Sequence, residues 1–341
     1  MNPQYLPEIS HKTLLLFILI PLAFTAGYIS SNLSSKSIQP GYALRANAAG
    51  YKFVSPLLAC QEDSNSTLVE FKTLKDKILR LTKASTEAGQ IIQSSIYFRD
   101  PYKGRWFGIN EYANYAPASL LKVPLMMAYL KQAETDPSML KKVFFYKKNL
   151  ASASPLIETP LLKDNTQYAA LELIQAMIID SDNNAKDLLK NTVNPDILSK
   201  TYTELGIESP YNESNRAVPE YHISAKTYAL FFRVLYNATF LSRDMSEKAL
   251  DMLSDTKFAK GIRAGIPPSI HIAHKYGVHV SQEDGEQIVE LSDCGIVYNA
   301  NRPYLLCLMT KGKNPNELAA YITSIAATIQ SSINNEQIEN L

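Results

Sequence analysis

The spacing of apolar residues along the chain predicts a mixture of helices and strands. Between Leu68 and about Thr86, apolar positions recur every three or four residues, which is the period of a helix with one buried face. Residues 91–100 and 104–110 then form two apolar runs separated by Asp, Pro and Gly, a pattern typical of two strands joined by a turn. A shorter strand-like run lies at 51–58.

Helical patterns fill the middle of the chain, and strands return near its end. The clearest helical segments are 166–180, 195–205 and 224–236. Strand-like runs at 274–280, 287–298 and 303–311 precede a final helix at 316–330. Because strands lie at both ends with helices between them, we expect an α+β fold. Its antiparallel sheet would be assembled from both ends of the chain, with an all-helical lobe inserted at about 136–255.

The first residues carry an uncharged apolar stretch. Thr13–Ile29 fits a short membrane-spanning helix or the apolar core of a signal peptide. Lys12, just before it, favours an N-terminus inside the cell and an exported remainder. No small-residue cleavage pattern follows closely, so we favour an uncleaved anchor. We expect a membrane-anchored, extracytoplasmic protein with an anchor or signal segment at 1–30, a linker at 31–67 and a folded domain at 68–341.

Composition narrows the classes of function. Of the 341 residues, 46% are hydrophobic and 20% are charged, as in an ordinary globular protein. With 34 basic against 33 acidic side chains the net charge is +1, so the chain has no broad positive field to attract nucleic acid. We therefore expect no nucleic-acid partner, and we expect a monomer.

The cysteines allow two interpretations. Cys60, Cys294 and Cys307 are too few and too scattered for a disulfide scaffold or a zinc site. Cys294 and Cys307 lie on two apolar runs, and a tight turn centred on Ala300 and Asn301 would place them opposite one another. A cross-strand disulfide and two buried thiols packed as small hydrophobes both fit, and we favour the thiols.

A serine and a lysine interrupt an apolar helical run between Tyr115 and Leu130. Ser119 and Lys122 are three positions apart, so on a helix they lie on one face and the amine can reach the hydroxyl. Burial disfavours the charged form of an amine, and a neutral amine can accept the serine proton, which makes the serine a nucleophile. Ser-x-x-Lys by itself, however, occurs by chance in many chains.

Two further polar segments are candidates for the same site. Ser181, Asp182 and Asn183 follow an apolar helical run, where they can also stop one helix and cap the next. Lys275 and Gly277 lie on the first of the late strands, where a lysine can also protect a sheet edge from aggregation. Each segment, taken alone, favours the structural interpretation.

The three segments together, in this order, favour a catalytic interpretation. Ser-x-x-Lys on a buried helix, Ser-Asp-Asn at a helix junction and Lys-x-Gly on a strand form the motif set of the penicillin-recognising serine enzymes. The sequence resembles the class A β-lactamase family from about Ser94 to the C-terminus. The resemblance implies the β-lactamase/transpeptidase-like fold, an antiparallel sheet flanked by helices (α/β/α), with no cofactor and no metal.

The resemblance implies a role for each catalytic side chain. Ser119 would attack the amide carbonyl of a β-lactam or a peptide and form an acyl-enzyme, with Lys122 taking part in removing its proton. Ser181 would pass a proton to the leaving nitrogen. Lys275 would orient Ser181 and attract the substrate carboxylate.

Further residues would bind the substrate. Asn183 would hold the substrate amide and also contact Lys122, and Gly277 would let the substrate lie close to the strand. The backbone N–H groups of Ser119 and Val278 would form the oxyanion hole.

Two positions depart from the family's pattern. The third motif usually has Thr or Ser where this chain has Tyr276, whose ring is too large to hold a substrate carboxylate in the same way. The family's deacylating glutamate follows Ser-Asp-Asn on a loop, but the matching position here is Tyr211, with Asn215 at the loop's asparagine. Glu208 and Glu213 are neighbours of that position and do not match it, so we nominate no deacylating base.

These residues suggest three functions. We expect a serine hydrolase of the class A β-lactamase family that opens β-lactam amides. The alternative with the same fold is a D,D-peptidase or transpeptidase-like penicillin-binding protein that acts on cell-wall peptides. A non-catalytic surface protein is disfavoured, because burying two lysines beside a serine is costly for a pure binding module.

Overall fold

The structure is a computed structural model of the chain. It describes residues 44–45, 51–55, 57–59, 71–102, 104–149, 162–211, 217–218, 220–300 and 302–339. All of these belong to one compact unit, Ala43–Leu341. The anchor predicted at 13–29 lies outside the described residues. None of the helices described is both long enough and apolar enough to span a membrane.

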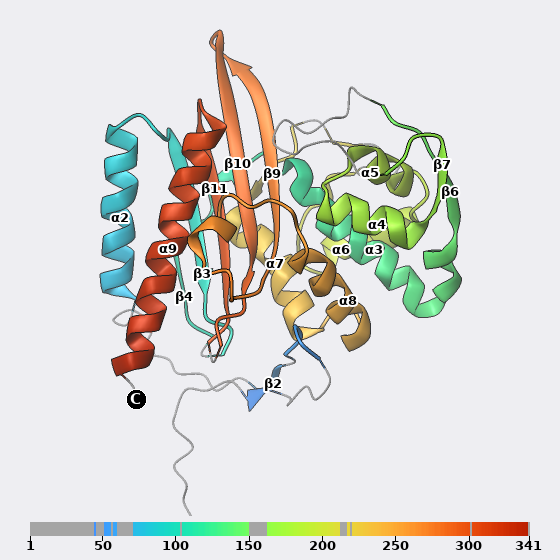
Figure 1. The fold of residues 1–341 in the computed structure, drawn as a ribbon, viewed down its shortest axis with the longest axis horizontal. Helices are drawn as coiled ribbons and strands as arrows, with labels where there is room; N and C mark the ends of the chain where they lie inside the picture. The colour runs from blue at the N-terminus through green and yellow to red at the C-terminus, as the bar shows by residue number, and fades with distance from the viewer. Residues whose placement is uncertain are drawn as a thin grey trace, which may run out of the picture. The chain divides into compact units, whose positions relative to one another are not determined.

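Five antiparallel strands form the central sheet, in the order β4-β3-β11-β10-β9 (Figure 1). The strands are β3 (Gln93–Arg99), β4 (Trp106–Ile109), β9 (Ile272–Glu283), β10 (Glu286–Val297) and β11 (Tyr304–Gly312). Two of them precede the helical middle of the chain and three follow it, which confirms the predicted sheet. β9 is the edge strand beside the helical lobe (Figure 1).

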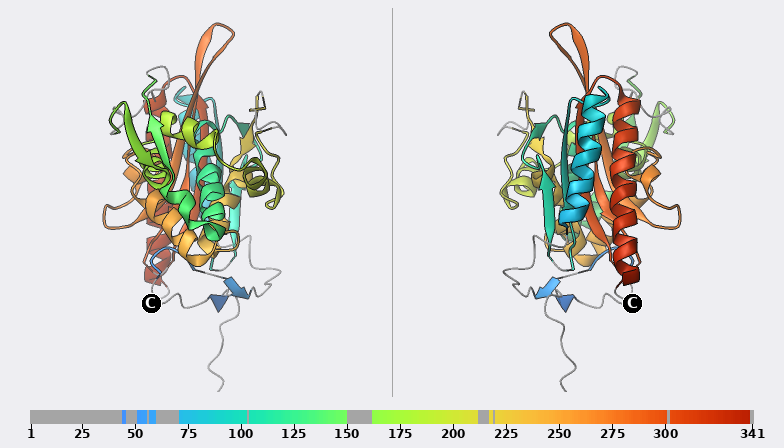
Figure 2. Two further views of the ribbon diagram at one scale, coloured as in Figure 1. Left: turned by 90° about the vertical axis from the view of Figure 1, so that its right-hand side faces the viewer. Right: turned by 90° about the vertical axis from the view of Figure 1, so that its left-hand side faces the viewer.

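Helices cover both faces of the sheet. α2 (Lys72–Glu87) and α9 (Pro315–Glu339) lie side by side on one face, as Figure 2 shows. α7 (Ala225–Asn237) packs on the other face against β3, β10 and β11. Side chains of successive strand residues point to opposite faces, so Leu306 enters the core under α2 and α9 while Cys307 enters the core under α7. The predicted α/β/α arrangement is confirmed.

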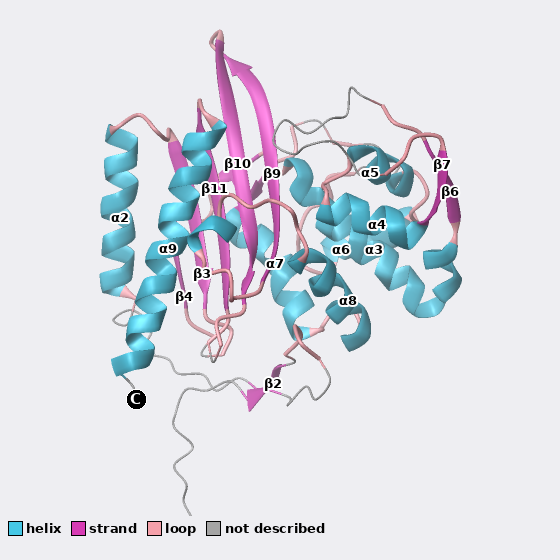
Figure 3. Cartoon of the chain, in the orientation of Figure 1, coloured by secondary structure: helices cyan, strands magenta, loops and turns pink. Residues whose placement is uncertain are grey.

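A lobe that is mainly helical lies beside β9 (Figure 3). Its helices are α3 (Lys122–Thr135), α4 (Ala170–Ile179), α5 (Asn183–Lys190), α6 (Pro195–Thr203) and α8 (Arg243–Ser254). It also contains a two-stranded sheet that periodicity did not predict, formed by β6 (Val143–Tyr146) and β7 (Thr166–Ala169). The helix predicted from residue 166 starts only at Ala170, because the Glu172 carboxylate accepts the Ala169 N–H and caps the helix there.

The strand predicted at 51–58 is wrong in its first part. Residues 51–55 are not a strand, and β2 comprises only Leu57–Ala59. The backbone N–H groups of residues 52–54 instead donate to the Glu247 carboxylate of α8, at 2.6 to 3.0 Å. These donors are therefore not free to pair with a strand.

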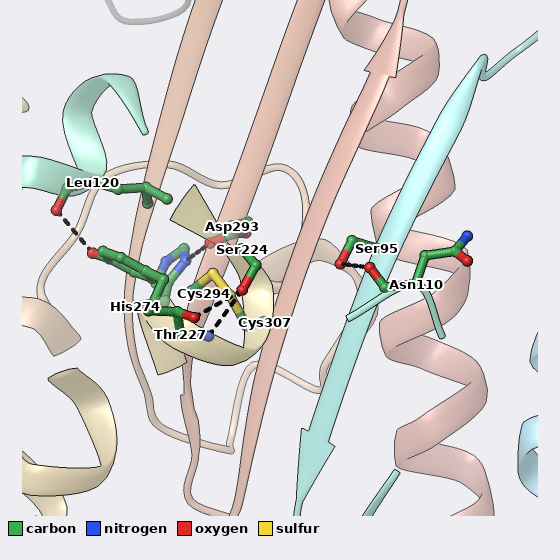
Figure 4. Close-up of a disulfide and its surroundings, with 10 residues drawn as sticks. Ser95, Asn110, Leu120, Ser224, Thr227, His274, Asp293, Cys294 and Cys307 are labelled. Atoms are coloured by element: carbon green, nitrogen blue, oxygen red, sulfur yellow. Dashed lines mark hydrogen bonds and ion pairs between the residues drawn. A yellow bond between two sulfur atoms is a disulfide. The ribbon is translucent and has the colours of Figure 1, made fainter. Parts of the chain in front are cut away.

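Cys294 and Cys307 face each other across β10 and β11, as predicted, and form a disulfide (Figure 4). The expectation of two free thiols is therefore wrong. Both residues are fully buried, with Cα atoms 4.0 Å apart, so their side chains meet on one face of the sheet. Lys275 is the cross-strand neighbour of Cys294, which places the bridge beside the third predicted motif.

Candidate active site

Ser119 lies on a turn that leads into the buried helix α3. A 3-10 helix, Ala118–Leu121, precedes α3, so the serine and the lysine are not on one continuous α-helix as predicted. Ala118 has a φ of 46°, a left-handed conformation that costs a residue other than glycine about 1–2 kcal/mol. The Tyr228 hydroxyl donates to the Leu120 carbonyl oxygen at 2.9 Å and holds the turn from α7.

The Lys122 amine is directed at the Ser-Asp-Asn segment. Its side chain is 1% exposed. Nζ donates to the Ser181 carbonyl oxygen at 2.5 Å, to Ser181 Oγ at 3.0 Å and to Asn183 Oδ1 at 2.6 Å. The structure therefore brings these three predicted residues together. Among the hydrogen bonds of the described residues, none joins Nζ to the Ser119 hydroxyl.

The Ser-Asp-Asn segment connects α4 to α5 and both caps a helix and lines the site. Ser181 has a φ of 58°, and its carbonyl oxygen accepts from Lys122. Asp182 accepts the Ala185 N–H at 3.0 Å, which makes it the N-cap of α5, and it also accepts the Tyr146 hydroxyl at 2.7 Å. The structural interpretation of this segment is thus correct, and it does not exclude the catalytic one.

Lys275 is the second buried amine. It lies on β9, is 0% exposed, and its Nζ has no hydrogen-bond partner among the residues described. Burial lowers the pKa of Lys275 to about 7, although the charges of Asp293 and Asp180 oppose this. The pKa of Lys122 falls well below its usual value, first through burial and then through the charges of Lys275 and Lys186. Both amines are therefore closer to losing a proton at neutral pH than exposed lysines are.

His274 and Asp293 form a buried pair beside Lys275 that the sequence analysis did not predict. His274 Nδ1 and Asp293 Oδ1 are 2.8 Å apart (Figure 4), and the other Asp293 oxygen accepts the Ile262 N–H at 2.8 Å. Both side chains are almost completely buried, at 1% and 0% exposed. The available signal was a polar residue on each of two strand-like runs, but a sequence does not show which strands place two such residues together.

Gly277 brings β9 against the turn that carries Ser119. A Cβ atom at this position would lie 2.8 Å from the Pro117 carbonyl oxygen and 3.1 Å from the Ser119 nitrogen. The glycine therefore lets the serine's own turn pack closely against β9. Its expected role beside the substrate stays a prediction. Val278, the next residue and a predicted oxyanion-hole donor, is half-buried on the same strand.

Tyr276 packs in the apolar core and contacts Lys275. Its ring is 1% exposed and stacks on Phe258 with centroids 4.0 Å apart. The Lys275 amine lies 4.6 Å from the centre of the same ring. The ring therefore serves as an apolar and cation–π neighbour of the lysine.

The loop after α6 contains Tyr211, the residue predicted to match the family's glutamate. Tyr211 is half-buried, its ring packs edge-on against Tyr202, and the Lys190 amine lies 4.6 Å from its centre. Glu208 is exposed, whereas Glu213 and Asn215 lie outside the described residues. In the described part of the chain, no group of three or more His, Cys, Asp or Glu could hold a metal ion.

Comparison with known proteins identifies the family. The profile described as "Beta-lactamase enzyme family" matches residues 73–333, which include all three motifs. The chain belongs to this family. The resemblance to the class A β-lactamase family that the motifs indicated is confirmed. A comparison with curated proteins gave no match.

Solved structures of β-lactamases share the fold. A class A β-lactamase from Mycobacterium abscessus is 18% identical, with a TM-score of 0.63 over 76% of this chain and 98% of that one. A β-lactamase from Chitinophaga pinensis is 19% identical, with a TM-score of 0.64 over 76% and 99%. The protein PBP-A is 21% identical, with a TM-score of 0.62 over 77% and 97%, and one of its structures is an acyl-enzyme complex with penicillin G. At these identities the likeness establishes the β-lactamase-like fold.

Proposed function

We propose that this β-lactamase-family protein is a serine hydrolase that opens β-lactam amides through an acyl-enzyme on Ser119. The observation that carries the proposal is the contact of the buried Lys122 amine with Ser181 and Asn183, on a helix that starts at the Ser119 turn. A neutral amine has two N–H groups. The Ser181 carbonyl and the Asn183 amide oxygen can accept both, which leaves the nitrogen lone pair to receive a proton.

The chemistry would follow from these contacts. Ser119 Oγ forms a bond to the amide carbonyl carbon while its proton passes to Lys122, and the C–N bond then breaks. Ser181, within reach of Lys122, passes that proton to the leaving nitrogen. Lys275 would supply positive charge for a substrate carboxylate, and the Ser119 and Val278 N–H groups would stabilise the oxyanion. Water would then release the acyl group.

Intact-mass spectrometry during incubation with benzylpenicillin tests the proposal. We expect a mass increase equal to one penicillin in the wild type and none in Ser119→Ala. The matched control is Ser324→Ala, an exposed serine on α9, which should acylate like the wild type. Wild-type protein that gains no mass and leaves the benzylpenicillin unhydrolysed would contradict the proposal and favour a non-catalytic role.

A second candidate function is a penicillin-binding D,D-peptidase or transpeptidase. The observation that favours it is Tyr211, which packs against Tyr202 and supplies no carboxylate to activate water. Without such a base, acylation proceeds while hydrolysis stalls. In the same time course, loss of the added mass within minutes supports the β-lactamase. An adduct that persists for hours supports the penicillin-binding protein.

Two observations support a location outside the cytoplasm. The Cys294–Cys307 disulfide is a bond that persists in oxidising compartments. The apolar run at 13–29 fits an anchor or an export signal. Both agree with a substrate that the protein meets outside the cytoplasm, whether a β-lactam or a cell-wall peptide.

A further inference from the structure

The turn that carries Ser119 is held by a carboxylate that the motifs do not include. Glu290, on β10, accepts the Ala116 N–H at 2.6 Å, although 174 positions separate the two residues. The contact is short, as expected when an ionised oxygen accepts the bond. Ala116 directly precedes the Pro117–Leu120 segment and lies three positions before the serine.

The sheet explains why Glu290 reaches this turn. Ser292, two positions further along β10, pairs with Gly277 of β9, and Gly277 is the residue against which the serine's turn packs. Glu290 pairs with His279, two positions beyond Gly277 on the same strand. Strand residues two apart share a face. The Glu290 side chain therefore lies on the face of the sheet that packs against the Ser119 turn, next to Gly277.

The turn needs such support because its backbone is strained. Ala118, immediately before Ser119, has a φ of 46°. A left-handed alanine persists only where the surrounding structure holds it. Tyr228 holds the far end of the turn through the Leu120 carbonyl oxygen, and Glu290 holds the near end through Ala116.

We propose that Glu290 is a positioning residue for the nucleophile, fixing the turn so that Ser119 Oγ and the Ser119 N–H are presented together. This inference rests on the proposed acylation of Ser119, and it adds a residue to that site. Glu290 does not touch the substrate in this role. It acts through Ala116 on the backbone conformation that precedes the serine.

Amide hydrogen exchange tests the inference without any substrate. In Glu290→Ala, amides within 116–120 should exchange about tenfold faster than in the wild type. In Glu290→Gln, which keeps an oxygen acceptor of the same shape, the rate should be largely restored. The matched control is Glu286→Ala, an exposed glutamate on the same strand that pairs with Lys313 and should change nothing at 116–120. Unchanged exchange in Glu290→Ala would overturn the inference.

Acylation kinetics distinguish a failure of this inference from a failure of the proposed function. Stopped-flow acylation by penicillin should show about a tenfold lower rate constant in Glu290→Ala, with the dissociation constant of the initial complex unchanged. Glu290→Gln should restore most of that rate. If the wild type is not acylated, the proposed function fails, and hydrogen exchange alone decides the role of Glu290.

A further measurement covers the case in which Glu290→Ala does not fold. Selective 15N-alanine labelling reports the Ala116 N–H directly in the wild type and in Glu290→Gln. We expect its proton resonance to move upfield in Glu290→Gln, because a neutral amide oxygen accepts less strongly than a carboxylate. An Ala116 resonance at the same position in both proteins would overturn the inference.

Discussion

Lys122 Nζ and Asn183 Oδ1 lie 2.6 Å apart, although the residues are 61 positions apart in the chain. The first is the opening residue of α3 and the second the opening residue of α5. The contact joins two helix N-termini at one point, where the lysine is buried and close to a second amine. Most of the chemistry expected of this site depends on the charge state that this arrangement gives to Lys122.

Removing the Lys122 amine should nearly abolish acylation. We expect Lys122→Met to lower the acylation rate about 10²- to 10⁴-fold, the usual contribution of a general base. Because the reactive form is the neutral amine, the wild-type rate should fall as the pH drops through the Lys122 pKa. That pKa lies well below the usual lysine value through burial and the charges of Lys275 and Lys186. Stopped-flow measurement of the acylation rate between pH 5 and 10 gives this acid limb of the pH–rate profile.

A change at Lys186 tests the electrostatic part of that prediction. Its charge lowers the pKa of Lys122, so Lys186→Gln should raise that pKa and move the acid limb to higher pH. The shift should be small and should shrink in high salt, because Lys186 is partly exposed. Lys200→Gln, an exposed lysine on α6, is the control. A limb that stays in place in Lys186→Gln argues against Lys122 as the titrating base.

Lys275 should make the protein more stable as the pH rises above neutral. Its pKa is about 7 in the folded protein and about 10.4 when unfolded. Between these values the unfolded chain binds a proton that the folded protein does not, so the free energy of unfolding rises with pH, by at most about 1.4 kcal/mol per pH unit for one group. Urea denaturation at pH 7, 8 and 9 measures the slope.

Lys275→Met tests this prediction. In this variant the free energy of unfolding should rise less between pH 7 and 9, because the contribution of Lys275 is gone. Lys83→Met, whose side chain is 77% exposed in the wild type, should keep it. Equal slopes in the wild type and in Lys275→Met would mean that Lys275 stays charged when buried.

Gly277→Ala should damage the site more than the fold. The new Cβ would lie 2.8 Å from the Pro117 carbonyl oxygen, so the turn must move away from β9. We expect acylation at least tenfold slower and a stability loss of about 1–3 kcal/mol, the usual range for overpacking. Gly285→Ala is the control, because its glycine has a φ of 82° and nothing within 4 Å. It should lose stability through backbone strain and keep the wild-type acylation rate.

The disulfide should be detectable by counting thiols. In a Cys60→Ser background, the denatured protein should show no reactive thiol before reduction and two afterwards. Cys294→Ser should lower the free energy of unfolding by about 3 kcal/mol, because the bridge closes a loop with a sequence separation of 13. Two thiols in the unreduced protein would support the buried-thiol alternative.

Much of the fold could be predicted because its pattern is local. The strands at 93–99 and 106–109 and the final helix follow directly from apolar spacing. β6 and β7 could not be predicted in this way. Val143 and Phe145 are exposed, and the alternation of buried and exposed residues covers only a few positions. The boundary at Ala170 depended on a carboxylate three positions into the run. Such capping contacts change where a helix begins without changing its periodicity.

The site divides in the same way. Motif order nominated five site residues: Ser119, Lys122, Ser181, Asn183 and Lys275. The structure brings Lys122 of the first motif into contact with Ser181 and Asn183 of the second. His274, Asp293 and Glu290 could not be identified from the sequence, because each is a polar residue on a strand and belongs to no motif. The contact that each of these side chains makes depends on which turn or strand lies opposite it in the folded protein.

The sequence by itself determined the central sheet, most of the helices and the order of three chemical motifs, since these depend on residue types and spacings within short windows. Tertiary structure alone decided where the Lys122 amine points, that Cys294 and Cys307 are bridged, and that Glu290 supports the Ser119 turn. The physical reason is distance along the chain. Burial, strand register and contacts between remote segments set these charges and directions, and none of them exists until the chain has folded.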